Sequence, residues 1–570
     1  MSGSAKAEAD KKSSVRTNVH PDPPNGRALP IRRSLCNLRT IMFQKYCIST
    51  SILVLVFSFG VIALGAGARE SNRHVVVVVW DGMRPDFVSE KTTPTLWKLA
   101  REGVTFRNHH PVYPSATQVN GTAMVTGVYP ARSGVIANYA YRPEIDRARS
   151  ISVESPPVVT KGDELTGGKY IAVPTIADII QGAGGRTVMT SAKTVGLLLD
   201  RHAGKGPAGN RVTLFAGQTL PRDVLTSIVA TLGPFPSANL QRDDWTTKAV
   251  TDLLWKDGLP ALSVIWLGQP DLTEHESGPG AALALAAIKS SDDNLAAILS
   301  ALDRQGVREA TDLFLVSDHG FSTIKRSIDL RKLLRDAGFA SKTEFDGEPK
   351  PGDIMLVGNG GSVLFYVIGQ DATVTRRLVE FLQQSDFAGV IFTKLDLPGA
   401  FRLYDAKIDN SHAPDVVMAF RWYDSKNQFN APGMIDADWQ RKAGEGTHAS
   451  LSRFDMHNTL IAAGPDFRRG QADEMPTGNV DLAPTILHIL GIKPPQEMDG
   501  RVLFEAMAGA DQAPTEKEAE TKTLEAKKDF PAGTWRQSMK ISHVGSTTYL
   551  DEGNGAFVPK KEQAGTDSGR

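Results

Sequence analysis

The sequence predicts an α/β fold in which a doubly wound, mostly parallel sheet carries helices on both faces. Continuous runs of β-branched and other apolar residues, such as His74–Trp80 and Leu262–Leu267, are typical of strands buried on both faces. Helical patterns alternate with these runs, for example at Pro94–Gly103 and in a long stretch from Ala281 to Leu302. Buried strands that alternate with helices favour a parallel sheet covered on both sides.

Further elements continue this alternation along the chain. Leu313–Val316 and Thr459–Ala463 have the same buried-strand character, and Ile176–Gly185 has a helical pattern. A last helix is predicted near Val480–Ile492, with Gly491 as its C-terminal cap. We expect this helix to close a main domain that spans residues 69–508.

Two later segments depart from the pattern. Residues 335–445 are rich in Gly, Pro and Asp and contain short strand-like pieces, Ser362–Ile368 and Asp415–Trp422, which predict an inserted small α+β subdomain. Residues 509–530 are charged and poor in apolar side chains, which indicates a linker or a surface helix. Residues 531–570 are expected to form a terminal strand pair and tail.

The N-terminal region has the composition of a leader segment that directs export. Residues 1–41 are polar and aperiodic, so we expect either a disordered extension or a misplaced gene start, with translation beginning at Met42. Residues 42–68 contain Lys45, an apolar run at Ile52–Leu64 and the small residues Ala66–Ala68, as in a secretory signal peptide. An uncleaved membrane anchor is the alternative. The protein is thus expected to be exported, periplasmic or extracellular, and membrane-attached if the leader is kept.

Composition excludes several classes of function. The 570-residue chain has a formal net charge of zero, which argues against nucleic-acid binding driven by bulk charge. Its two cysteines, Cys36 and Cys47, lie before or within the leader. A cysteine nucleophile or a thiolate metal site is therefore excluded from the rest of the chain.

Metal-binding side chains follow the predicted strands. Asp81 comes directly after one strand, Asp318 and His319 follow another, and Asp271 lies four residues past a third. Ligands of open α/β sheets bind beyond the carboxyl ends of the strands, so these residues are expected at one rim. Asp271 and His275 are spaced i, i+4 and would share one face of a helical turn. Asp and His ligands without Cys suit zinc, with manganese or iron as alternatives.

A hydroxyl and a further histidine complete a set suited to phosphate chemistry. His448 lies in the motif GEGTHAS, and Thr117 stands at the start of a predicted helix that runs to about Thr126. A helix N-terminus favours phosphate, and a metal-coordinated Thr117 would become a nucleophile while a second ion, ~3.5–4 Å from the first, holds the leaving oxygen. Asn120, one turn further on, is expected to donate to a phosphate oxygen. Each motif alone has an ordinary interpretation, such as an Asp-Gly turn or a threonine cap.

The order of these motifs resembles that of the alkaline phosphatase superfamily, and within it the type I phosphodiesterase/nucleotide pyrophosphatase family, which includes the phosphonoacetate hydrolases. The resemblance covers roughly His74 to Val502 and is strongest in the nucleophile segment Tyr113–Val135. It implies an alkaline phosphatase-like catalytic domain and a Thr117 that is transiently phosphorylated. It also implies one zinc held by Asp271, His275 and His448, a second held by Asp81, Thr117, Asp318 and His319, and a phosphate contact from Asn120.

The function implied is that of a secreted two-zinc phosphodiesterase or nucleotide pyrophosphatase with a phosphothreonine intermediate. A threonine nucleophile favours this branch over the serine-dependent monoesterases, and the absence of later cysteines disfavours the sulfatases. A phosphonate or phosphomonoester hydrolase is the alternative, and a non-catalytic phosphate-binding protein is a remote one. Lys193 lies near the expected rim, where it would either pair with a substrate carboxylate or phosphate or be an ordinary exposed lysine. The polar segment Asn138–Gly168 carries no family pattern, so it leaves open which small phosphate ester or phosphonate is the physiological substrate, and the oligomeric state is equally open.

Overall fold

The computed structural model describes residues 73–201, 211–510, 513–515 and 518–560. The extension predicted at 1–41, the leader predicted at 42–68 and the end of the tail after residue 560 lie outside the described residues. Within the described ranges, no helix is both long and apolar enough to cross a membrane.

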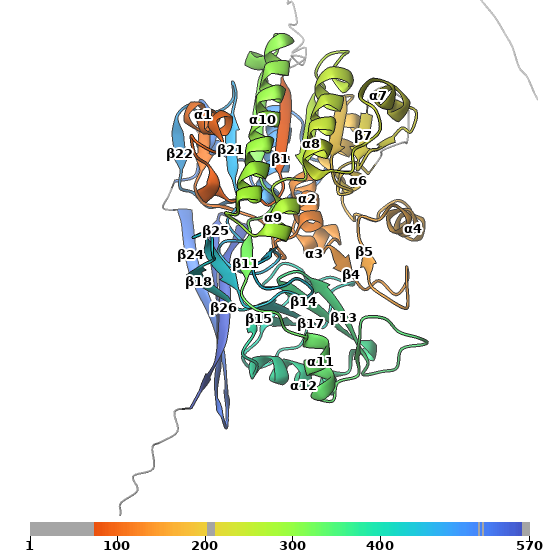
Figure 1. The fold of residues 1–570 in the computed structure, drawn as a ribbon, viewed down its shortest axis with the longest axis vertical. Coiled ribbons are helices and arrows are strands. Elements are labelled where there is room, and N and C mark those ends of the chain that lie inside the picture. Colours follow the sequence, from red (N-terminus) through yellow and green to blue (C-terminus); the bar gives the residue numbers. More distant parts are fainter. Residues whose placement is uncertain (1–72, 202–210, 511–512, 516–517, 561–570) are drawn as a thin grey trace, which may run out of the picture. The chain divides into compact units, whose positions relative to one another are not determined.

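A nine-stranded, mostly parallel sheet forms the centre of the fold, which confirms the α/β class (Figure 1). Parallel pairing joins β10 (Thr311–Val316), β1 (His74–Trp80), β9 (Leu262–Leu267), β6 (Thr187–Ser191) and β7 (Arg211–Phe215), in that order. β8 (Gln218–Leu220) adds an antiparallel edge beside β7, whereas β21 (Leu460–Ala463) is antiparallel to β10 and leads on to β2 (Val104–Phe106) and β22 (Gln471–Asp473).

Helices cover both faces of this sheet. Val75, Val77 and Val79 of β1 pack in one cluster with α5 (Ile176–Gly182) and α13 (Leu482–Ile489), while the alternate residues of β1 pack with α1 (Pro94–Glu102) and α10 (Ala282–Arg304) on the other face. Each fully buried valine contributes about 1.5–3 kcal/mol relative to an exposed one. The continuous apolar run of β1 is explained by burial on both sides. Helices near the site and the far edge are α2 (Thr117–Thr126), α3 (Pro130–Ser133), α4 (Pro156–Thr166), α6 (Gly196–Leu199), α7 (Val224–Leu232), α8 (Asn239–Lys248) and α9 (Asp271–Ser277).

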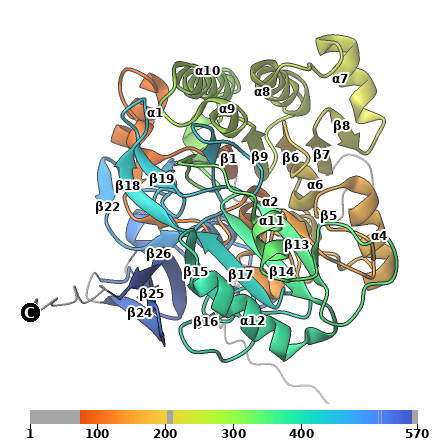
Figure 2. The same ribbon diagram turned by 60° about the horizontal axis from the view of Figure 1, so that its bottom comes forward.

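A second, six-stranded sheet is built from the region that was expected to form an inserted subdomain (Figure 2). Its order is β12 (Ser341–Lys342), β13 (Ile354–Asn359), β14 (Ser362–Val367), β17 (Val416–Phe420), β15 (Ala388–Thr393) and β16 (Phe401–Arg402), with α11 (Leu330–Asp336) and α12 (Ala372–Gln383) packed on one side. The strand-like pieces at Ser362 and Asp415 correspond to β14 and β17. The domain limits themselves stay a prediction.

A small sheet connects this region to the carboxyl rim of the main sheet. It is formed by β18 (Trp422–Lys426), β19 (Pro432–Ile435), β11 (Ser322–Ile324) and β20 (Gly446–Thr447). β11 follows the segment of Asp318 and His319, and β20 directly precedes His448. The pairing of β11 with β20 therefore brings these two segments together. Four short strands form two further pairs: β3 (His109–His110) pairs with β23 (Thr477–Gly478), and β4 (Tyr139–Ala140) pairs with β5 (Ile151–Ser152).

The C-terminal region corrects one expectation. β24 (Ala519–Phe530), β25 (Gly533–Val544) and β26 (Thr547–Pro559) form an antiparallel three-stranded sheet, so most of the predicted linker at 509–530 is a strand. β24 lies at an edge, where most of its charged side chains face solvent while Leu524 and Ala526 pack inward. A charged sequence is typical of an exposed edge strand, because charges discourage pairing with other chains.

Candidate active site

The three central strands deliver their acidic residues to one place. Asp81 follows β1, Asp318 follows β10, and Asp271 begins α9 after β9. Because β1 lies between β9 and β10 in parallel register, the three carboxylates meet at the carboxyl rim. The backbone N–H of Asp271 donates to the carbonyl of Asp81 at 2.9 Å, which fixes α9 beside the end of β1.

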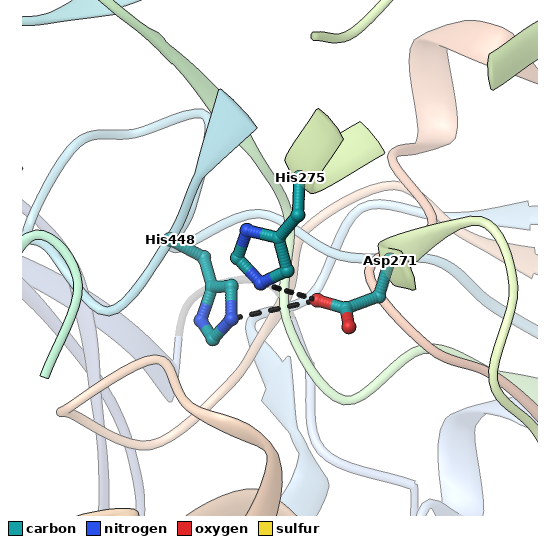
Figure 3. Close-up of side chains that lie close together, drawn as sticks. All are labelled: Asp271, His275 and His448. Atoms are coloured by element: carbon teal, nitrogen blue, oxygen red, sulfur yellow. Dashed lines mark ion pairs between the residues drawn. The ribbon is translucent and has the colours of Figure 1, made fainter. Parts of the chain in front are cut away.

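A first ligand group consists of Asp271, His275 and His448, whose donor atoms lie within 4.8 Å of one another (Figure 3). Asp271 Oδ1 lies 3.2 Å from His275 Nε2 and 3.4 Å from His448 Nε2. Each imidazole uses Nδ1 on a backbone carbonyl, His275 on Gly446 at 3.0 Å and His448 on Ser115 at 2.8 Å. Since a carbonyl only accepts, Nδ1 carries the proton and both Nε2 lone pairs face the carboxylate oxygen. A metal ion bound between them would be coordinated by the lone pairs of all three acceptors.

A second group lies beside the first and includes the threonine. Donor atoms of Asp81, Asp271 and His319 also lie within 4.8 Å of one another. His319 Nε2 lies 3.2 Å from Asp318 Oδ2, 3.6 Å from Asp81 Oδ1 and 3.3 Å from Thr117 Oγ1. Its Nδ1 donates to the carbonyl of Gly320, so Nε2 again points at the cluster as an acceptor.

Burial makes this cluster electrostatically costly without a cation. Asp81 and Asp318 are both 0% exposed. Burial, reinforced for Asp81 by the charge of Asp318, raises the pKa of Asp81 to about 8, and burial raises that of Asp318 to about 7. Asp81 Oδ1, Asp271 Oδ1 and Asp318 Oδ2 are buried oxygens that accept no hydrogen bond from any residue that the structure describes. Orphaned carboxylate oxygens with imidazole nitrogens and no thiolate form a donor set that fits zinc.

Lys193 is inside this cluster and not on an exposed rim. Its ammonium lies 2.9 Å from Asp81 Oδ2 and 2.9 Å from Asp271 Oδ2, and its side chain is only 16% exposed. Burial would lower the pKa of Lys193, but the charges of Asp271 and Asp81 outweigh burial and raise it. The ordinary reading of Lys193 as a solvent-exposed lysine is therefore wrong.

Thr117 is the first residue of α2, as the sequence indicates, and is 2% exposed. It places its hydroxyl at the second ligand group and its backbone at a helix N-terminus, where unpaired N–H groups and the helix dipole favour an anion. The packing of α2 is close on all sides, since each of its residues is buried.

Asn120 does not face the cluster, which contradicts the expectation that it contacts phosphate. Its Nδ2 donates to the carbonyls of Val112 and Ala116, each at 3.1 Å. Its Oδ1 accepts from the N–H of Val112 at 2.7 Å and from Asn479 Nδ2 at 3.0 Å. Helical side chains lean toward the helix N-terminus, so the amide folds back over the turn that leads into α2. Asn120 shapes that turn and has no donor left for a ligand.

Asn138 is a second amide next to the start of α2, which the sequence did not single out. Its Oδ1 accepts from the backbone N–H of Gln118, the neighbour of Thr117, at 3.1 Å. The residue is half-buried, and within the described part of the chain its Nδ2 has no acceptor. Asn138 lies in the polar segment that showed no motif, so only the folded contact with α2 identifies it.

Asn479 was also missed, and it joins the two halves of the site. Its Nδ2 donates to Asn120 Oδ1 at 3.0 Å and to the carbonyl of Asp318 at 2.8 Å, while its Oδ1 accepts from His109 Nε2. His109, which has no evident partner in the sequence, is fully buried, and burial lowers its pKa to about 3. A neutral His109 therefore holds Asn479 between α2 and the segment of Asp318.

Known proteins resemble this chain in sequence. Residues 75–425 match the family described as type I phosphodiesterase / nucleotide pyrophosphatase. Ectonucleotide pyrophosphatase/phosphodiesterase family member 7 from Homo sapiens is 22% identical over 454 residues, which cover 78% of this chain and 86% of that protein. Family member 1 from Homo sapiens is 25% identical over 260 residues, 45% of this chain and 24% of that longer protein.

Solved structures share the fold. Murine ectonucleotide pyrophosphatase/phosphodiesterase 5, in an inactive form in complex with AMP, superposes with a TM-score of 0.54 at 19% identity, covering 76% of this chain and all of that chain (100%). The human form of that protein gives a TM-score of 0.54 at 18% identity and covers 77% of this chain. At these identities the likeness shows the alkaline phosphatase-like architecture.

Proposed function

Because the chain belongs to the type I phosphodiesterase/nucleotide pyrophosphatase family, we propose that it is a two-zinc hydrolase that cleaves phosphodiester or pyrophosphate bonds through a phosphothreonine at Thr117. Membership makes it a hydrolase of that family. The proposal of two zinc ions and a phosphothreonine rests on the arrangement of acceptors around Asp271 and His319, with the Thr117 hydroxyl 3.3 Å from His319 Nε2.

The residues that would hold the two ions divide as the sequence resemblance implies. Asp271, His275 and His448 would hold one, and Asp81, Asp318, His319 and Thr117 the other. Two bound zinc ions would supply Lewis acidity at the phosphoryl group and lower the pKa of the threonine hydroxyl. Manganese or iron would fit the same donors less well.

The chain's own groups position the reaction. The oxygen of Thr117 forms a bond to phosphorus as the bond to the leaving alcohol or phosphate breaks, and water then releases the product from the threonine. The N-terminus of α2 faces the phosphate oxygens, and Asn138 Nδ2, which is held by its contact to Gln118, donates to one of them. Donors fixed before the reaction stabilise the charge that grows in the transition state.

A second candidate is a phosphonate or phosphomonoester hydrolase on the same site. Lys193 favours it, because an ammonium this close to Asp81 and Asp271 is suited to an additional negative oxygen on the substrate. Export through the predicted leader is part of the proposal in both cases.

The test compares substrates and variants of the purified protein. We expect bis-p-nitrophenyl phosphate to be cleaved faster than p-nitrophenyl phosphate or phosphonoacetate, with about two zinc ions bound per chain and with activity lost on chelation. Thr117→Ala should abolish turnover and leave folding and zinc content largely intact, whereas the exposed helix residue Thr226→Ala serves as a control. Near-normal turnover by Thr117→Ala would refute the nucleophile, and faster monoester or phosphonate cleavage would favour the second candidate.

A further inference from the structure

A cavity of about 870 Å³ lies between α1, β21 and the loops beyond them, apart from the ligand cluster. Its wall is mainly apolar, with Trp97 and Ala100 from α1, Phe106 from β2, Leu460 from β21 and Phe454 from the segment that precedes β21. None of the proposed metal ligands lines it. A volume of this size is typical of a pocket for one small molecule.

One wall separates this cavity from the ligand cluster. Arg84 lines the cavity and donates from Nη1 to the carbonyl of Phe321 at 3.0 Å. The Phe321 ring lies 4.9 Å from the His275 ring and 5.4 Å from the His448 ring, measured between centroids. The cavity is therefore one side-chain layer behind the histidines.

Most polar groups of the inner wall are already hydrogen-bonded within the protein. Arg84 is 2% exposed, and its N–H groups donate hydrogen bonds to Asp86 and to the carbonyls of Phe321 and Pro432. The hydroxyls of Thr105 and Thr459 also donate to backbone carbonyls. A cavity whose polar atoms are already satisfied holds water weakly, so an apolar body gains free energy by entering it.

One uncompensated positive charge borders this apolar interior. Three further arginines contribute to the lining, namely Arg101, Arg107 and Arg453. Arg107 pairs with Glu474 at 3.4 Å and Arg453 with Asp424 at 2.7 Å. Arg101, in the last turn of α1, has no acidic partner within the described ranges. The one carboxylate of the lining, Asp86, is neutralised by Arg84.

We propose that this cavity binds an amphiphile with a single hydrocarbon chain and one anionic head. The hydrocarbon chain packs against Trp97, Val88 and Phe454, whose side chains are partly exposed to the cavity, and the head pairs with the exposed Arg101. An apolar wall selects the chain through buried area, and the unpaired guanidinium selects the sign of the head group. This site is independent of the reaction proposed at Thr117.

The test measures binding to the full chain without any use of activity. Titration with the fluorescent fatty acid cis-parinarate, followed by displacement with oleate, should show one site per chain, and oleyl alcohol, which has no charge, should bind more weakly. Arg101→Gln should weaken oleate by about fivefold and leave oleyl alcohol unaffected. Arg335→Gln, an exposed arginine on α11, is the matched control.

Filling the cavity should remove the site altogether. Ala100→Trp should abolish binding of both oleate and oleyl alcohol, and Trp97→Ala, whose side chain is 36% exposed, should weaken both if Ala100→Trp fails to fold. Unchanged binding in the variant that is folded would overturn the site. Equal affinity for oleate and oleyl alcohol, or displacement of parinarate by lysophosphatidylcholine but not by oleate, would overturn the anionic head.

Discussion

The ammonium of Lys193 lies 2.9 Å from a carboxylate oxygen of Asp81, inside the cluster that is suited to metal ions. It reaches Asp271 at the same distance, so a single cation of the chain bridges the two ligand groups. A metal ion that binds these carboxylates has to displace the ammonium or tolerate its charge. Lys193 therefore opposes metal binding while it keeps two buried carboxylates compatible with the fold.

Lys193→Gln is expected to bind zinc more tightly than the unaltered chain, by about tenfold or more, because a like charge next to the ions is removed. Competition with a chelator of known affinity measures the effect. Lys161→Gln, on the exposed face of α4, provides the control. Weaker zinc binding in Lys193→Gln would mean that the lysine supports the ligands instead.

Asn120→Ala is expected to destabilise the protein. The substitution leaves the N–H of Val112 without its acceptor and removes one of the two acceptors of Asn479 Nδ2, both in a buried region. Each such loss costs about 1–3 kcal/mol. Thermal unfolding should show a clearly lower midpoint, and a midpoint equal to that of the unaltered protein would be inconsistent with this scaffold role.

Asn138→Ala is expected to behave in the opposite way. Its side chain makes one hydrogen bond, to the N–H of Gln118, and its free Nδ2 is available to substrate. We expect kcat to fall by about 10²–10³ with little change in the unfolding midpoint, as for loss of an oxyanion donor. The two variants together distinguish a structural role from a role in catalysis. If Asn120→Ala lowers kcat without lowering the unfolding midpoint, and Asn138→Ala does the reverse, Asn120 is the phosphate contact, as the sequence predicted.

Asp312 predicts a pH dependence of stability that is unrelated to the active site. Burial, with the neighbouring Asp466, raises the pKa of Asp312 to about 7 from 3.8. A carboxyl whose pKa is raised by folding contributes stability below its unfolded pKa, and this is lost as pH rises through the folded value. The unfolding midpoint should thus decline between about pH 4 and pH 7. Asp312→Asn should flatten that decline, whereas the exposed Asp336→Asn should not.

The parts of the site that are local in sequence could be predicted. Asp81, Asp318 and His319 directly follow buried strands, and a parallel sheet brings the ends of such strands together wherever they occur in the chain. The i, i+4 spacing of Asp271 and His275 is a similarly local signal, and α9 carries both.

The parts that depend on contacts between distant segments could not be predicted. Asn120 has the helical spacing of a residue near Thr117, but the turn before α2 folds over its amide, and spacing contains no information about that turn. Asn138 and Asn479 reach α2 from other elements, and a polar residue in an irregular segment gives no sign of its partner. β24 was missed because its charged side chains hide the alternation of an edge strand.

The last strand of the fold, β26, contacts residues next to the helix that carries Thr117. Tyr549 of β26 donates its hydroxyl to Asp481, two residues after Asn479, and Thr548 accepts from Tyr129 just beyond α2. All seven proposed ligands precede β26 in the chain. A chain that ended before β26 would therefore keep every residue proposed as a ligand and lose the contacts that this strand makes next to α2.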